Sequence, residues 1–171
     1  LYTYSGQYSD TLRTYLQLRE GPVFELIAEH NLYTSVADKL VALCDFDVAE
    51  TVKMLVENTD KIPPAEVVAQ LAAHPQYQLA YLHALDERDI AAAADYHKLL
   101  IELYATYEPG KLMAFLKRSN SYSLDDALKT CEQHRLYPEM AFVLQRMGST
   151  HEALALIVNR VGDIRMALEF A

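Results

Sequence analysis

The sequence is short of cysteine, and it contains no long apolar run. Its two cysteines, Cys44 and Cys131, lie among apolar residues with helical spacing, and no metal-type spacing joins them. This favours buried, reduced thiols in a cytosolic protein, and the sequence leaves a single bridge between them open. No uninterrupted apolar stretch approaches the roughly 20 residues that a membrane span needs, and there is no signal peptide. We therefore expect no direct insertion into a membrane.

Positive charge is also scarce. The chain has 15 Lys and Arg against 24 Asp and Glu, a formal charge of −9. A nucleic-acid backbone and an anionic lipid surface both attract basic proteins, so this balance argues against both partners. Lys111, Lys117 and Arg118 form a local basic spot, for which a solvated helix face is the favoured interpretation.

Motifs for metal binding and catalysis are incomplete. His151-Glu152 begins like the zinc-binding helix of a metalloprotease, but position 155 is alanine where the second histidine should stand. Three other candidate metal ligands are His83, Asp86 and His97, of which only His83 and Asp86 share a predicted helix face. Surface or interface roles are the favoured interpretation for all three. The five glycines form no phosphate-binding loop, and no serine lies on a strand-to-helix elbow. We expect no enzyme, no cofactor and no catalytic, cofactor-binding or metal-binding residue.

Helical periodicity is what the sequence does contain, from end to end, with no sustained alternation that would indicate a strand. Residues with helix-boundary chemistry interrupt it about every dozen positions. Asp47 with Glu50 resembles a capping box, and two further pairs open later helices, Ser123 with Asp126 and Ser149 with Glu152. The pattern predicts about twelve helices, which cover residues 7–19, 22–30, 33–44, 90–107 and 112–118 or begin near Asp47, Pro63, Pro75, Ser123, Pro138, Ser149 and Asp163.

A weak internal repeat accompanies this pattern. Gly148 precedes Ala153-Leu154 by five residues, and three similar copies are Gly162 with Ala167-Leu168, Gly6 with Thr11-Leu12 and Ser123 with Ala127-Leu128. Glycine permits the left-handed conformation that ends a helix, and the small residue then lets a neighbouring helix approach closely. Chance spacing in a helical bundle rich in alanine and leucine is the alternative.

The predicted fold is an all-α solenoid of stacked antiparallel helical hairpins. Loops this short force neighbouring helices to run antiparallel, and no helix is apolar all round. Each helix therefore buries one stripe against its neighbours in the chain, as in a solenoid. We expect residues 1–171 to form a single solenoid segment of a longer protein, because the chain starts at Leu1 and ends inside an apolar pattern.

Tyrosine is abundant, with twelve copies and no tryptophan. Tyr77 and Tyr81 share a predicted helix face, as do Tyr104 and Tyr107. Tyrosine often marks protein interfaces, since its ring can be buried while its hydroxyl stays hydrogen-bonded. Rings that line the grooves between helices are the favoured interpretation.

Several segments, in order along the chain, resemble the vacuolar protein sorting-associated protein 41 family. They are Leu26-Ile27-Ala28-Glu29-His30-Asn31-Leu32, Ile62-Pro63-Pro64-Ala65-Glu66-Val67-Val68, Tyr81-Leu82-His83-Ala84-Leu85, Leu103-Tyr104-Ala105 before Phe115-Leu116, and Arg146-Met147-Gly148 before Ala153-Leu154. The resemblance implies the clathrin heavy-chain repeat region of that family, an α-solenoid. In the family, this region lies between an N-terminal β-propeller-like part and a C-terminal RING-like zinc domain, and the 171 residues resemble the repeat region alone.

The resemblance implies a scaffold in the HOPS tethering complex, which docks membranes at the vacuole, lysosome or late endosome. The implied partners are other HOPS subunits and a second copy of the chain, with the adaptor protein complex three and a late-endosomal Rab GTPase reached through the full-length protein. The implied location is cytoplasmic and peripheral on those membranes. The alternatives are another coat-type solenoid scaffold, a peptide-binding helical-repeat receptor and, in a third class, an α-helical enzyme.

We predict that the purified chain holds no stoichiometric zinc, because Ala155 takes the place of the second ligand and the cysteines are 87 positions apart. Elemental analysis after dialysis against a chelator measures this directly. One zinc ion per chain that survives the dialysis would overturn the prediction.

Overall fold

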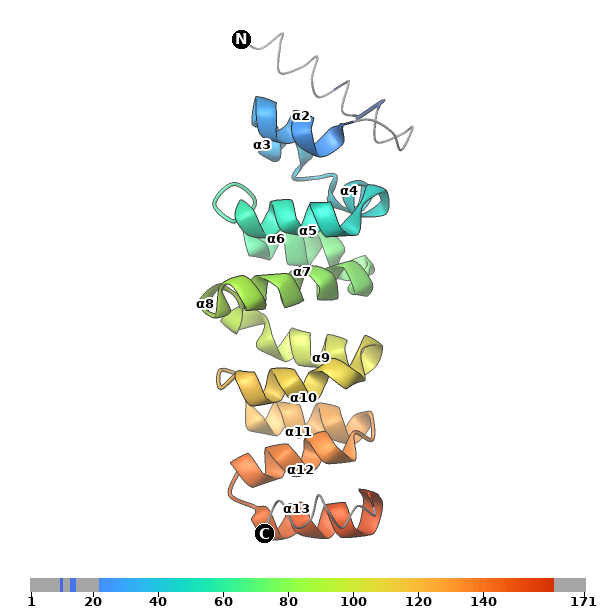
Figure 1. Cartoon of the computed structure of the whole chain (residues 1–171), viewed down its shortest axis with the longest axis vertical. Helices are drawn as coiled ribbons and strands as arrows, with labels where there is room; N and C mark the ends of the chain where they lie inside the picture. The colour runs from blue at the N-terminus through green and yellow to red at the C-terminus, as the bar shows by residue number, and fades with distance from the viewer. Residues whose placement is uncertain (1–9, 11–12, 15–21, 162–171) are drawn as a thin grey trace. The chain divides into compact units, whose positions relative to one another are not determined.

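The computed structural model describes residues 10, 13–14 and 22–161. The chain divides into two compact units, Leu1–Ala92 and Ala93–Ala171. The described residues are helices and short connections without a strand. Within each unit, helices that follow one another in the chain lie side by side (Figure 1). The predicted fold class, an all-α solenoid, is confirmed.

The described helices of the first unit are α2 (Val23–His30), α3 (Tyr33–Val36), α4 (Leu40–Phe46), α5 (Val48–Glu57), α6 (Pro64–Gln70), the 3₁₀ turn η1 (Leu71–Ala73) and α7 (Pro75–Arg88). At the boundary between the units lies α8 (Ile90–Ala93). The described helices of the second unit are the 3₁₀ turn η2 (Ala94–Tyr96), α9 (His97–Tyr107), α10 (Pro109–Arg118), α11 (Leu124–Gln133), α12 (Tyr137–Arg146), α13 (Thr150–Leu156) and the π-helical turn η3 (Ile157–Val161). The predicted helices at 7–19 and from Asp163 lie outside the described residues.

Most predicted helix starts are confirmed, and the reason is local. The Asp47 carboxylate accepts a hydrogen bond from the backbone N–H of Glu50 at 3.1 Å and caps α5. Pro64 and Pro75 occupy the first helical position of α6 and α7, where a missing N–H costs nothing. Ser149 precedes α13 as its N-cap residue, as predicted, although its side chain makes no capping hydrogen bond.

Left-handed residues end three of the helices. Gly148, at φ 84°, follows α12, and the next N–H, that of Ser149, donates to the carbonyl of Leu144 at 2.9 Å. Asn31 and Arg135 take the same role after α2 and α11, at φ 53° and 56°. Glycine and asparagine adopt this conformation readily, whereas for arginine it is uncommon. The sequence therefore predicts a helix end at a glycine or asparagine and misses the helix end at Arg135.

Two long predicted helices are broken, and the prediction of each as one helix is wrong. Residues 33–44 form α3 and the start of α4, with a turn in which the amide side chain of Gln70 donates to the carbonyl of Ala37. Residues 90–107 form α8, η2 and α9. Neither break contains glycine or proline. Gln70 belongs to α6, so the bond that accompanies the first break is tertiary and leaves no local signal. The helix predicted from residue 112 begins earlier, at Pro109.

Each unit buries one apolar stripe per helix. In the first unit the interior includes Leu40, Leu43 and Leu55, all fully buried. In the second, Phe115 lies among aromatic rings, with ring centres 5.5 Å from Tyr104 and 6.2 Å from Tyr122. The tyrosine rings predicted to lie between helices are buried at Tyr81 and Tyr104, which are 0% and 1% exposed. Tyr107 is 40% exposed and does not follow this prediction.

The repeat alanines are fully buried where the structure describes them. Ala127 and Ala153 are both 0% exposed. Ala153 of α13 packs in one apolar cluster with Ala141 and Leu144 of α12. A small residue therefore lies on each side of the α12–α13 contact, which lets the two helices approach closely, as the repeat predicts. Ala167, Gly162 and Gly6 lie outside the described residues.

Arg146 fastens the end of α10 to α12. One of its terminal nitrogens, Nη1, donates to the carbonyl of Ser119 and to the hydroxyl of Tyr122, each at 2.7 Å, and Nη2 donates to the carbonyl of Lys117 at 3.2 Å. The Tyr122 hydroxyl in turn donates to the carbonyl of Leu116 at 2.9 Å. Burial raises the pKa of Tyr122 and Arg146 offsets this only in part, so the hydroxyl keeps its proton at neutral pH. The last carbonyl groups of a helix have no hydrogen-bond donor within that helix, and Arg146 supplies donors to those at the end of α10.

We predict that Arg146→Met lowers the free energy of unfolding by about 2–3 kcal/mol, because it leaves carbonyl groups and the Tyr122 hydroxyl without a charged donor. Urea denaturation measures the change. Lys129→Met is the matched control: it removes an exposed charge from α11 and should change the value by no more than about 0.5 kcal/mol. Equal effects of the two variants would show that the guanidinium bonds do not stabilise the fold.

We predict that Ala153→Leu costs about 1–3 kcal/mol and that the loss stays local, because the larger side chain forces α13 away from α12. Amide hydrogen exchange should show reduced protection in α12 and α13 and unchanged protection in α5 and α7. An equal loss from α2 to α13 would mean that the described helices unfold as one cooperative globule. Unchanged protection everywhere would mean that position 153 tolerates bulk and that the repeat has no packing role.

Candidate protein-interaction surfaces

The candidate metal ligands have partners of other kinds. His83 lies 3.4 Å from the carboxylate of Glu87, one turn further along α7. Asp86 and His97 are both 1% exposed. Within the described residues, His, Cys, Asp and Glu nowhere form a group of three that could hold a metal ion. The predictions that the chain has no metal site and no catalytic residue stay predictions.

A serine and a histidine do meet inside the second unit. The Ser119 hydroxyl lies 3.1 Å from Nδ1 of His97, and the Phe115 ring packs edge-on to the imidazole at 5.2 Å. Ser119 is only 3% exposed, so a substrate cannot reach this pair as it could reach an activated nucleophile. The same hydroxyl accepts from the N–H of Ser121 at 3.3 Å, so the contact fixes the turn after α10.

Both cysteines are free and buried, as the sequence predicts. Burial raises the pKa of Cys44 to about 11 and that of Cys131 to about 12. The neighbouring carboxylates of Asp45 and Glu139 add to the rise. At neutral pH both thiols are therefore protonated, which removes the thiolate that nucleophilic or metal-binding chemistry requires.

The basic spot lies on an exposed face of α10, as predicted. Lys111 pairs with Glu108 at 2.9 Å. Lys117 and Arg118 lie exposed in the last turn, where positive charge favours the carboxyl end of the helix dipole. All three side chains are exposed, which agrees with a solvated helix face.

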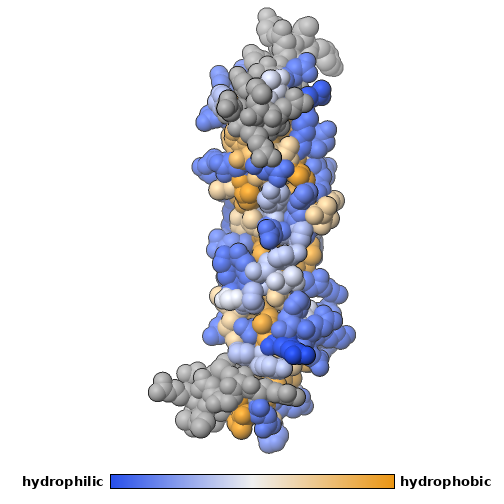
Figure 2. Space-filling view, turned by 90° about the vertical axis from the view of Figure 1, so that its right-hand side faces the viewer, coloured by the Kyte–Doolittle hydropathy of each residue, from blue (hydrophilic) through white to orange (hydrophobic). Residues whose placement is uncertain are grey.

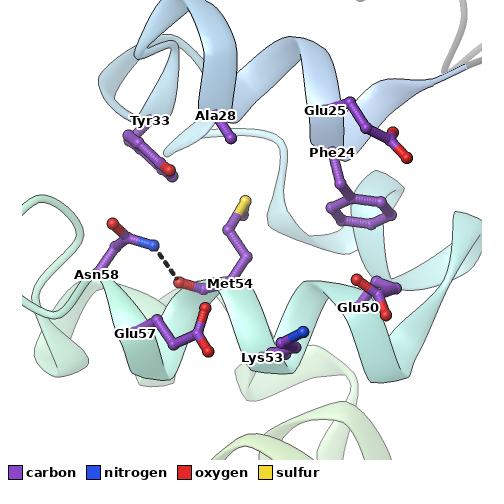
Figure 3. Close-up of a pocket in the computed structure, with 9 residues that line it drawn as sticks. All are labelled: Phe24, Glu25, Ala28, Tyr33, Glu50, Lys53, Met54, Glu57 and Asn58. Atoms are coloured by element: carbon purple, nitrogen blue, oxygen red, sulfur yellow. Dashed lines mark hydrogen bonds between the residues drawn. The ribbon is translucent and has the colours of Figure 1, made fainter.

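A groove between α2–α3 and α5 is the most distinctive surface of the first unit (Figure 3). It encloses about 260 Å³. Phe24, Ala28 and Tyr33 line it from α2 and α3, and the Met54 side chain rises from α5 toward Ala28. The amide of Asn58 donates to the Met54 carbonyl at 2.8 Å and holds the end of α5. The groove therefore has an apolar and aromatic interior.

Charged side chains surround this interior. Glu25 projects from α2, and Glu50, Lys53 and Glu57 line the groove from α5 (Figure 3). All four are exposed. Positions 50, 53 and 57 fall on one face of a helix, which the sequence could have revealed. The opposing wall could not have been found in this way, because it comes from α2 and α3, which α4 separates from α5 in the chain.

The rest of the described surface is mixed. On the face in Figure 2, apolar residues form narrow stretches between polar ones. The large apolar side chains that are more exposed belong to different helices or turns: Ile90, Tyr107, Met147 and Val158. Among the described helices, none has both the length and the apolar character needed to cross a bilayer.

Comparison with known proteins gives one consistent result. The vacuolar protein sorting-associated protein 41 homologues of Mus musculus and Homo sapiens are each 42% identical to this chain over all of its residues, which correspond to 20% of each protein. The homologue of Solanum lycopersicum is 39% identical, with 99% of this chain and 18% of that protein covered. The chain thus spans about a fifth of the length of these relatives. No solved structure matches it.

The match of a family model covers the same ground. The model described as the Vps41 TPR-like region matches residues 1–171. The resemblance found in the short sequence segments is therefore confirmed over the whole chain, and this chain belongs to the Vps41 TPR-like region family.

Proposed function

We propose that this chain is a protein-interaction scaffold of a HOPS-type membrane-tethering complex, in vesicle transport and fusion at the vacuole, lysosome or late endosome. The observation that carries the proposal is the family match over residues 1–171. The relatives are named for vacuolar protein sorting. The fold agrees with this role, because stacked helical pairs present long surfaces to other proteins.

The proposed partners are other subunits of the tethering complex, bound directly, and a second copy of this chain. The adaptor protein complex three and a late-endosomal Rab GTPase are proposed as partners of the full-length protein. Residues 1–171 act as one solenoid segment in this proposal, with the protein peripheral on the cytoplasmic side of the membrane. The role requires neither catalysis nor a cofactor.

We predict that the immobilised 171-residue chain captures other tethering-complex subunits from cytosol, with mass spectrometry as the readout. Two controls each disrupt one unit: Leu55→Asp and Leu116→Asp place a charge at a fully buried position. If only one of the two variants loses capture, the contact belongs to the unit that this variant disrupts. Capture of the same proteins by the native chain and by both variants, or of no tethering subunit by the native chain, would contradict the proposal.

A further inference from the structure

The net charge of the chain is concentrated in one part of it. Residues 22–92 contain twelve Asp and Glu but four Lys and Arg, a formal charge of −8 out of the total of −9. Residues 93–161 contain eight of each and are formally neutral. The acidic part is also the part that contains the groove between α2–α3 and α5. A ligand of this groove therefore meets an acidic environment on approach.

The carboxylates at the groove are available for a ligand. Glu25, Glu50 and Glu57 are exposed, and none of them forms an ion pair with a cation of the described residues. Lys53 is the one basic side chain that lines the groove within the described part of the chain. Another nearby cation, Lys61, lies 4.2 Å above the Tyr33 ring and covers that ring. Three carboxylates thus face one lysine at this surface.

The spacing of these carboxylates suits an elongated ligand. Glu50 and Glu57 are seven residues apart on α5, which is two turns or about 10 Å. That separation is too large for one metal ion but matches basic residues two turns apart on a second helix. Between the two carboxylates, Met54 faces Phe24 and Ala28 across the groove (Figure 3). Met54 is 9% exposed and flexible, so it can adapt to an inserted apolar side chain.

We propose that this groove binds a basic amphipathic helical segment of a partner protein. An apolar side chain of the segment enters between Phe24, Ala28 and Met54, and its Lys or Arg side chains pair with Glu25, Glu50 and Glu57. The inference deepens the proposed scaffold function and rests on it for the nature of the partner, a protein. At about 260 Å³ the groove is smaller than most sites that enclose a small molecule, and it has room for single side chains. An acidic peptide or a nucleic acid would meet repulsion.

The test uses the 171-residue chain labelled with ¹³C at its methionine methyl groups. Two synthetic helical peptides of equal length and apolar pattern serve as probes, one with lysine and one with glutamate at the polar positions. The basic peptide should shift the Met54 methyl resonance in a saturable way, whereas the acidic peptide should not. The methyl groups of Met113, Met140 and Met147, in the second unit, should stay in place and serve as internal references.

Matched variants locate the binding. The double variant Glu25→Gln/Glu57→Gln should bind the basic peptide with an affinity roughly threefold to tenfold lower, and its binding should depend less on salt. Glu29→Gln with Glu66→Gln is the control: it changes the net charge equally at exposed positions outside the groove, and affinity should change by less than about twofold. Ala28→Trp places an indole ring at an exposed position of the groove wall and should abolish binding without unfolding α2.

Three results would overturn the inference: no saturable Met54 shift with the basic peptide, equal shifts of all the methionine methyl groups, or equal loss of affinity in the two double variants. The last would show a general attraction to an acidic surface. These results concern a synthetic peptide and the groove side chains, whereas the capture experiment asks whether the native chain binds tethering subunits at any of its surfaces. Failure of the groove and failure of the scaffold role are therefore distinguishable.

Discussion

The inability of any one helix to bury its apolar stripe alone is the constraint on which this fold depends. Helices of 4 to 14 residues are too short to be stable in isolation, so each needs a partner helix. Close contact between α12 and α13 is possible because Ala141 and Ala153 leave room at the interface. The same requirement explains why Arg146 matters. It supplies donors to the end of α10 from α12, so that a polar helix end can lie beside its neighbour.

How far the sequence predicts this structure depends on whether a feature is local. The cap at Asp47, the first-turn prolines and the helix end at Gly148 each depend on a few adjacent residues, and each is predicted correctly. The breaks within residues 33–44 and 90–107 are missed. In the first, the Gln70 side chain of another helix donates a hydrogen bond to the turn. Arg135 is missed because an arginine in the left-handed region contradicts the local preference. The helix end there has the same backbone bond as at Gly148, since the N–H of Leu136 donates to the carbonyl of Cys131 at 2.9 Å.

The same division applies to the candidate interaction surface. The row formed by Glu50, Lys53 and Glu57 follows from helical spacing alone, and the acidity of residues 22–92 follows from counting. The groove itself cannot be predicted from the sequence, because Phe24 and Ala28 face Met54 only once α2 and α5 have packed. The family, by contrast, could be recognised from short segments. Those segments combine buried residues such as Ile27 and Val67 with exposed ones such as Glu29, so the resemblance does not depend on the core alone.

The uneven charge bears on how the proposed scaffold would select its partners. A formal charge of −8 in residues 22–92 destabilises the first unit by self-repulsion, and salt screens much of that effect. A basic ligand relieves the repulsion at the groove as it binds, so the electrostatic contribution favours basic segments over neutral ones of the same shape. The formally neutral residues 93–161 carry no net charge that would give such a long-range preference. In the proposed scaffold, the attraction of basic partners by net charge would therefore come from residues 22–92 alone among residues 22–161.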